Sequence, residues 1–278
     1  MKCYDCPRAC GADRERGEVG FCGGGYYASV AKTIYDFKYE EPCFGQSVAA
    51  VFFGGCALRC SYCQNYKISR NATGEVYDDG KLAWLFDGTD KPIDLVTPSH
   101  YLSAIERAVG LTENPHEYIY NTSGYETTES ISRAREFCGL FLTDFKYADG
   151  ELARKLSNAP DYFDKAVAAI REMKKTADVW AGDGNNRTLK QGVVIRHLVL
   201  PGQVNNSIAV LDAIKAEFGT DAVLSLMSQF TPNGLGEPTA RLKKIEYKLV
   251  AEHAMSLGFK NGYFQEFSSA DGRYTPEF

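Results

Sequence analysis

The feature that most constrains the fold is an alternation of short apolar runs with longer amphipathic segments. The apolar runs favour buried strands, at residues 47–53, 93–97, 117–121, 140–144, 193–200, 222–227 and 263–267. Helical spacing lies between them, at residues 99–109, 127–137, 162–176, 206–218 and 239–257, the last opening with a possible Thr cap. Strands that alternate with helices of this length predict βαβ units and a parallel sheet.

This pattern predicts an α/β fold, a full or partial barrel of about six βα units with its chemistry at the carboxyl ends of the strands. A chain of 278 residues with 44% hydrophobic content can bury such a core. We expect a cysteine-rich, metal-binding segment and extended lead-in over residues 1–46. Residues 47–278 are expected to form the core with a C-terminal extension, and residues 177–191 a surface loop.

Nine cysteines are present, and most of them fall in two tight clusters. Clustered cysteines without a secretion signal are typical of metal ligands rather than disulfides. Cys56, Cys60 and Cys63 have C-x3-C-x2-C spacing in the loop after the 47–53 run. Three such thiolates can hold a [4Fe–4S] cluster and leave its fourth iron open, although the spacing also allows a zinc site. Cys43 and Cys138 stand alone, and Cys138 is expected in the core.

The second cluster is Cys3, Cys6, Cys10 and Cys22, with C-x2-C-x3-C-x11-C spacing. The segment around it is rich in glycine and has too few apolar residues for a core of its own. A zinc ion with four thiolate ligands would stabilise such a segment, and we favour zinc. A second Fe–S cluster that relays electrons is the alternative. A third interpretation is that the four cysteines are free thiols.

The run GGCALRCSYCQN, placed after the first core strand, resembles the radical S-adenosylmethionine (SAM) superfamily. Over residues 3–230 the chain resembles enzymes related to the pyruvate formate-lyase activating enzyme, and among these the PflX-like branch. The segments that carry this resemblance are CPRACGADRERGEVGFC, YEEPCFG, FFGGCALRCSYCQNYKIS and IDLVTPSHY.

The resemblance implies a partial (β/α)6, TIM-like radical SAM barrel. It also implies that Cys56, Cys60 and Cys63 hold a [4Fe–4S] cluster, whose open iron binds SAM. One electron would cleave SAM, and the resulting 5′-deoxyadenosyl radical would abstract hydrogen, with a protein or peptide as the expected substrate. A one-electron donor such as flavodoxin or ferredoxin is implied as a partner. Chemistry on a small molecule, and a non-catalytic Fe–S or zinc electron carrier or scaffold, remain alternatives.

Further residues are placed near SAM by the same resemblance: Tyr62, Thr97, Pro98, Ser99, Asn121, Thr122, Asp144, Lys146, Arg196, Leu198, Ser228 and Gln229. Tyr62 and the backbone of Leu198 would meet adenine. Asp144 and Lys146 would approach the methionine and ribose parts, and two residues two apart on a strand share a face. Arg196 would bind the carboxylate. His197 would point to the opposite face and be packed or hydrogen-bonded.

The chain departs from the family pattern at the ends of several strands. Residues 96–100 read VTPSH where many relatives have Gly-Gly-Glu, so backbone carbonyls of Thr97 and Pro98 would meet the SAM amino group. Ser99 is alternatively a helix N-cap. Activating enzymes bind a monovalent cation at the positions that match Asn121, Thr122 and Asp144. Asn121 stands where those enzymes have a carboxylate. Ser228 or Gln229 would replace a histidine.

Charge and hydropathy exclude several classes of partner. The formal net charge is −5, and no basic excess favours nucleic acid. The first residues lack a basic region followed by an apolar one, and no window approaches the roughly 20 apolar residues of a membrane span. We therefore expect a cytoplasmic protein that binds neither nucleic acid nor membrane.

Overall fold

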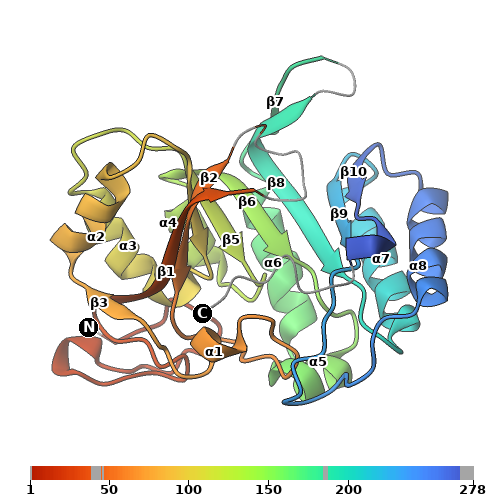
Figure 1. Ribbon diagram of the computed structural model, residues 1–278, viewed down its shortest axis with the longest axis horizontal. Coiled ribbons are helices and arrows are strands. Elements are labelled where there is room, and N and C mark those ends of the chain that lie inside the picture. Colours follow the sequence, from red (N-terminus) through yellow and green to blue (C-terminus); the bar gives the residue numbers. More distant parts are fainter. Residues whose placement is uncertain (1, 39–44, 46, 184–186, 270–278) are drawn as a thin grey trace.

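The computed structural model describes residues 2–38, 45, 47–183 and 187–269, and one mixed sheet forms its centre (Figure 1). The strands are β1 (Ala28–Phe37), β2 (Val48–Phe53), β3 (Glu75–Tyr77), β4 (Ile93–Val96), β5 (Tyr118–Thr122), β6 (Cys138–Asp144), β7 (Val179–Ala181), β8 (Thr188–Leu198), β9 (Val223–Met227) and β10 (Asn261–Phe264). Their order across the sheet is β10-β9-β8-β6-β5-β4-β2-β1-β3, with β7 paired to β8.

The pairing directions divide the sheet into a parallel core and antiparallel additions. Neighbouring strands from β2 through β4, β5, β6, β8 and β9 to β10 are parallel. Strands β1, β3 and β7 are added in antiparallel pairs. Within the described residues no pairing joins β10 to β3, so the sheet stays open. The parallel α/β core predicted from the alternation is therefore confirmed, without a closed barrel.

Helices follow most of the parallel strands and lead the chain back to the next one. They are α1 (Tyr66–Ser69), α2 (Asp79–Asp87), α3 (Leu102–Val109), α4 (Thr128–Ala134), α5 (Gly150–Ser157), α6 (Tyr162–Met173), α7 (Val204–Phe218) and α8 (Lys244–Leu257). Short 3-10 turns span Arg14–Arg16, Ser99–Tyr101 and Phe267–Ser269. Figure 1 shows α2 and α3 at the left of the sheet and α7 and α8 at its right.

Alternation along each strand separates two faces of the sheet. Side chains on the helix-covered face belong to the larger apolar cluster, among them Tyr120, Phe141 and Ile195. Their neighbours form a smaller apolar cluster on the other face, among them Ile119, Leu142 and Val194. Two residues farther along the same strands, this second face carries Asn121, Asp144 and Arg196. The carboxyl ends of β5, β6 and β8 thus bring three polar side chains together.

Three sequence predictions differ from the structure in their boundaries. The helix predicted over residues 239–257 begins at Lys244, because the Glu246 carboxylate accepts a hydrogen bond from the Lys243 backbone N–H (2.9 Å) and caps it there. Part of the predicted loop at 177–191 instead forms an antiparallel ribbon of β7 and the start of β8, which projects at the top of Figure 1. The strand predicted at 263–267 lies at Asn261–Phe264.

Helices α2 and α5 are short and were not predicted. Each begins at an aspartate whose carboxylate accepts backbone N–H groups of the first turn. Asp78 accepts from Lys81, and Asp149 accepts from Glu151 and Leu152. Such caps stabilise a helix start by about 1 kcal/mol. Helix α5 matters because it ends beside the loop after β2 that carries Cys56, Cys60 and Cys63, called the cysteine loop below.

The N-terminal segment, residues 2–27, lies against the core through buried polar contacts. The Arg8 Nε donates to the Ala57 carbonyl (2.8 Å) in the loop that follows β2. The Asp5 carboxylate accepts from Arg133 of α4 (2.9 Å), and the Asp5 carbonyl accepts from Ser130 (2.8 Å). A Cβ at Gly55 would lie 2.4 Å from the Cys22 carbonyl, so this close approach needs glycine.

Some sequence predictions fall outside the described residues. They concern Cys43, most of the YEEPCFG segment, residues 184–186 and the last part of the C-terminal extension, 270–278. Among the described helices, none combines the length and the apolar character that crossing a bilayer requires.

Candidate active site

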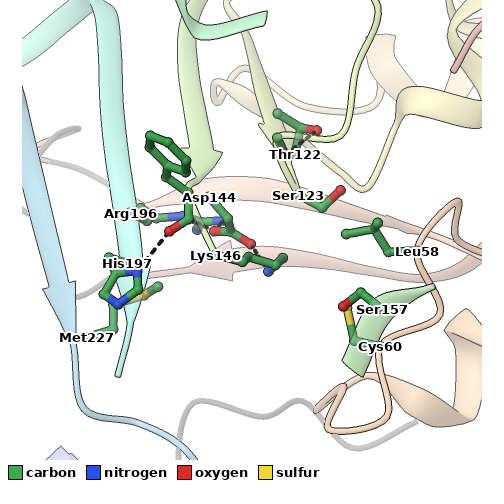
Figure 2. Close-up of polar contacts among 12 residues, drawn as sticks. Leu58, Cys60, Thr122, Ser123, Asp144, Lys146, Ser157, Arg196, His197 and Met227 are labelled. Carbon is green, nitrogen blue, oxygen red and sulfur yellow. Dashed lines mark hydrogen bonds and ion pairs between the residues drawn. The ribbon is translucent and has the colours of Figure 1, made fainter. Parts of the chain in front are cut away.

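A cavity of about 210 Å³ lies between the cysteine loop and the carboxyl ends of the parallel strands. It is lined by most of the residues that the sequence singles out: Cys56, Cys60, Tyr62, Cys63, Thr97, Asn121, Thr122, Asp144, Lys146, Arg196, Leu198 and Gln229. Figure 2 shows Asp144, Lys146 and Arg196 gathered at the strand ends, with Cys60 apart from them on the cysteine loop. Residues from several strands therefore meet the three cysteines at one place.

The cysteine loop follows β2 and needs an unusual backbone. Gly55 and Arg59 have φ of 88° and 55°, in the left-handed region, which costs energy for a residue with a side chain. Each cysteine sulfur in the loop accepts a hydrogen bond. Cys56 accepts from the Leu58 N–H (3.4 Å), Cys60 from the Ser157 hydroxyl (2.9 Å) and Cys63 from the Ser69 hydroxyl (3.4 Å).

Burial raises the pKa of the Cys60 thiol, and the ammonium group of Lys146 acts in the opposite direction. Burial likewise raises the pKa of Cys56 and Cys63. A buried thiolate therefore needs a compensating positive charge, and a bound metal supplies it. Donors at all three sulfurs suit thiolates, because each one stabilises negative charge.

The donor set of three thiolates suits a four-iron cluster. Within the described part of the chain, no three His, Cys, Asp or Glu side chains converge closely enough to hold one metal ion. The cysteines of a [4Fe–4S] cluster bind different irons and need not converge on one point, whereas the ligands of a zinc ion must do so. Cys56, Cys60 and Cys63 line one cavity and leave room beside them.

Asp144 holds two cations at the strand ends. Its carboxylate accepts from Arg196 Nε (3.0 Å) and Nη2 (2.9 Å), and it pairs with the Lys146 ammonium. Burial tends to raise the pKa of Asp144, but Lys146 and Arg196 outweigh it and hold this pKa below its ordinary value. Burial tends to lower the pKa of Lys146, and Asp144 reverses that effect and raises it. All three groups are therefore charged at neutral pH.

The Arg196 guanidinium also contacts β5. Its Nη2 donates to the Asn121 side-chain oxygen (2.7 Å), and the Asn121 amide donates to Asp94 on β4 (3.3 Å). Burial raises the pKa of Asp94 to about 7, against the effects of Asn121 and Arg196. A side-chain cation thus lies between Asn121 and Asp144, which together with Thr122 are the positions where the family resemblance implied a monovalent ion.

A buried carboxyl group, Glu126, lies behind the end of β4. The hydroxyls of Ser99 and Thr122 both donate to its Oε1, and its Oε2 has no hydrogen-bond partner among the described residues. Burial raises the pKa of Glu126 to about 7. Ser99 is thereby turned to Glu126 rather than to the cavity, and it neither lines the cavity nor caps a helix. Thr97, which does line the cavity, has a left-handed φ of 61°.

The remaining predicted residues divide between the cavity and its surroundings. Pro98 and Ser228 do not line the cavity, and the Ser228 hydroxyl donates to the Glu266 carbonyl (2.8 Å). Gln229 lines it, and the Gln64 amide donates to the Gln229 carbonyl (2.6 Å). His197 points to the opposite face from Arg196 and bonds the Phe145 carbonyl (2.7 Å), as strand alternation predicts.

The N-terminal cysteines lie near one another, since, besides burial, Cys22 and Cys3 contribute to the raised pKa of Cys6, and Cys10 contributes to that of Cys3. Cys3, Cys6 and Cys22 are buried, Cys10 is exposed, and none of the four forms a disulfide. The zinc site and the alternative second Fe–S cluster stay predictions, and we derive no chemical step from them.

Three polar residues of the site were missed from the sequence. Asp94 had a usable signal, because a charge inside an otherwise apolar strand needs a partner. Glu126 follows the Thr122-Ser123-Gly124 element closely, but its burial depends on packing. Ser157 lies 97 residues from Cys60, and no local pattern relates the two.

No protein-family model matches the chain. It is 24% identical over 245 residues to an uncharacterized protein of Methanocaldococcus jannaschii, an alignment that covers 83% of this chain and 66% of the relative. The chain therefore spans about two thirds of that protein's length.

Solved structures with a similar fold include three enzymes. Methylornithine synthase PylB is 14% identical with a TM-score of 0.45, over 75% of this chain and 68% of that one. anSMEcpe with bound AdoMet and a peptide is 14% identical with a TM-score of 0.49, over 75% and 60%. A spore photoproduct lyase variant with bound AdoMet and a dinucleoside spore photoproduct is 13% identical with a TM-score of 0.47, over 86% and 81%.

Proposed function

We propose that this chain is a radical SAM enzyme of the PflX-like branch, related to activating enzymes and built on a partial (β/α)6 barrel. One observation carries the proposal. Cys56, Cys60 and Cys63 line the same cavity as the network of Asp144, Lys146 and Arg196. A soft thiolate set that leaves an iron open suits a cluster, and adjacent cationic donors suit the carboxylate of an amino-acid ligand.

When bound, a reduced [4Fe–4S] cluster supplies the electron that cleaves SAM into methionine and a 5′-deoxyadenosyl radical. The residues of this chain bind and orient. Cys56, Cys60 and Cys63 would hold the cluster. Arg196 and Lys146 would present positive charge to the SAM carboxylate, and Asp144 fixes both cations in place.

The walls of the cavity offer a less polar side for the nucleoside part of SAM. Tyr62, Leu198 and Met227 line it. The Tyr62 ring is 6% exposed and packs near Phe230, with ring centroids 6.4 Å apart. Such a wall would exclude water from a reactive radical. The backbone at Thr97 would meet the amino group, as the resemblance implies.

The test is anaerobic reconstitution with iron and sulfide, reduction in the presence of SAM, and quantification of 5′-deoxyadenosine and methionine. We expect product from the wild type and none above background from Cys60→Ala. Cys138→Ala is the matched control, because Cys138 is a buried cysteine that does not line the cavity. Equal product from wild type and Cys60→Ala, or none from either, would refute the proposal.

The substrate and partners are proposed on the resemblance alone. A protein or peptide would donate the hydrogen atom, and flavodoxin or ferredoxin would supply the electron in the cytoplasm. Deuterium transfer from a labelled peptide into 5′-deoxyadenosine would support this substrate class, and transfer from small metabolites alone would contradict it. The iron, zinc and sulfide content of the wild type, measured beside a variant lacking Cys3 and Cys6, tests the N-terminal site. Roughly six to eight irons in the wild type, about two cubanes, would contradict zinc.

A further inference from the structure

A line of buried hydroxyl groups ends on one cysteine of the loop. The Tyr62 hydroxyl lies 2.8 Å from that of Tyr147, and the Tyr147 hydroxyl lies 2.6 Å from Ser157 Oγ. Ser157 Oγ in turn lies 2.9 Å from the Cys60 sulfur, and Figure 2 shows the two side chains in contact. Tyr147 and Ser157 are 0% and 1% exposed, so water does not compete for these bonds.

The number of protons available fixes the direction of hydrogen-bond donation along this line of hydroxyl groups. A hydroxyl has one proton to donate, and a metal-bound thiolate can only accept. Ser157 must therefore donate to Cys60, which leaves its oxygen to accept from Tyr147. The Tyr147 oxygen then accepts from Tyr62. Every dipole in the line points its positive end toward the sulfur.

We propose that this hydroxyl relay raises the reduction potential of the cluster that Cys60 would hold, with Ser157 as the positioning residue that delivers it. The inference rests on the proposed function. A reduced cluster carries one more negative charge than an oxidised one, so a donor at a thiolate stabilises the reduced state more. Hydrogen bonds in series polarise one another, so Tyr147 strengthens the donation from Ser157.

Cys60 is distinguished from the other two cysteines by this contact. The donors to Cys56 and Cys63 lie at 3.4 Å, and the donor to Cys63 is a single hydroxyl, Ser69. The 2.9 Å bond to Cys60 is the shortest of the three and is the one supported by further hydroxyls. The effect on the potential should therefore be larger at Ser157 than at Ser69.

The position of Ser157 is fixed from two sides. The Ser61 N–H donates to the Leu156 carbonyl (2.8 Å), which joins the cysteine loop to the end of α5. Arg8 donates to the Ser157 carbonyl (3.1 Å) and also to the Ala57 carbonyl in the cysteine loop (2.8 Å). The N-terminal segment thus holds the donor and the cysteine loop in register.

The experiment is a redox titration of the reconstituted cluster, without SAM, followed by electron paramagnetic resonance. Iron and sulfide content is measured for each variant first. We expect Ser157→Ala to shift the midpoint potential to a more negative value. Tyr147→Phe should shift it in the same direction by less, and Ser157→Thr, which keeps a hydroxyl, should restore it. Ser207→Ala is the matched control, because Ser207 is also 1% exposed but bonds His197 instead.

The outcomes separate this inference from the proposed function. A full cluster in Ser157→Ala with an unchanged potential overturns the relay alone, whether or not SAM is cleaved. If the wild type assembles a cluster but cleaves no SAM, the proposed function is overturned, and the shift in midpoint potential still tests the relay. If the wild type assembles no cluster, both are overturned. Should Ser157→Ala lose its cluster, Tyr147→Phe decides, because it leaves the serine donor in place.

Discussion

Replacing Asp144 with asparagine should lower the free energy of unfolding and make it vary with pH in the alkaline range. The substitution keeps the size of the side chain but removes the charge that Arg196 and Lys146 share. The three side chains are only 16%, 13% and 17% exposed. Two cations would then face each other across a neutral amide in a poorly solvated place.

The expected loss is about 3–5 kcal/mol, the usual cost of removing one partner from a buried ion pair. Asp212→Asn is the matched control. Asp212 pairs with His253 at the surface, where it is 53% exposed, so its loss should cost no more than about 1 kcal/mol. The Lys146→Met change in the Asp144→Asn background should recover part of the stability, because it removes one uncompensated charge.

The pH dependence follows from Lys146. In the wild type Asp144 holds its pKa above the ordinary lysine value, so the pair still contributes stability at pH 10. In Asp144→Asn, burial acts without that opposition and lowers this pKa. The unfolded chain then binds more protons than the folded one up to about pH 10.4, so the variant gains stability as pH rises through that window.

Urea unfolding followed by circular dichroism, with refolding checked, measures both effects. The difference in free energy of unfolding between wild type and Asp144→Asn, called the gap below, should be largest near neutral pH and should narrow toward pH 10. A gap below about 1 kcal/mol, equal to that of Asp212→Asn, would show that the network does not contribute as an ion pair. A gap that is constant with pH would refute the argument about Lys146.

Three further predictions follow from the same region. The free energy of unfolding of Glu126→Gln should rise relative to that of the wild type, by up to about 3 kcal/mol, as pH increases from about 4.5 to 7. The reason is that the folded wild type keeps a proton on Glu126 that the unfolded chain releases. Urea midpoints at pH 4.5 and 7.5 measure this, and the same difference between variant and wild type at both pH values would contradict it. SAM cleavage should proceed equally in sodium, potassium or choline salts, because Arg196 already lies between Asn121 and Asp144; a strict potassium requirement would contradict this. Arg8→Lys should lose roughly 1–3 kcal/mol in thermal unfolding, because lysine cannot reach the Ala57, Ser157 and Asn158 carbonyls together, and an unchanged melting temperature would contradict it.

The sheet was predictable because its strands are buried on both faces and read as apolar runs. Strand alternation also placed Asp144 and Arg196 on one face, since that periodicity is fixed by backbone geometry. Helix α5 was not predictable in this way, because its apolar residues are few and its start depends on one aspartate cap. Its terminal Ser157 meets Cys60 only after the chain has folded.

The end of β4 shows why the rest of the site could not be predicted. In place of the Gly-Gly-Glu element of the superfamily that the sequence resembles, this chain has Thr97 with a left-handed φ of 61°. A β-branched residue in that region costs about 1–3 kcal/mol, so surrounding contacts must hold it there. The Thr97 N–H donates to the Asn121 carbonyl (2.8 Å), and the following turn is fixed by Ser99 on Glu126.

The backbone shape at the β4 end is therefore held by side chains from more than one strand end. Glu126 lies 27 residues beyond Ser99, yet its buried carboxyl group joins the ends of β4 and β5 through Ser99 and Thr122. If the site needs a backbone carbonyl aimed at the cavity, only the conformation at Thr97 has to be kept, and any residues that hold it will serve. The left-handed conformation at Thr97 therefore does not require glycine here, because Ser99, Thr122 and Glu126 hold the turn behind it.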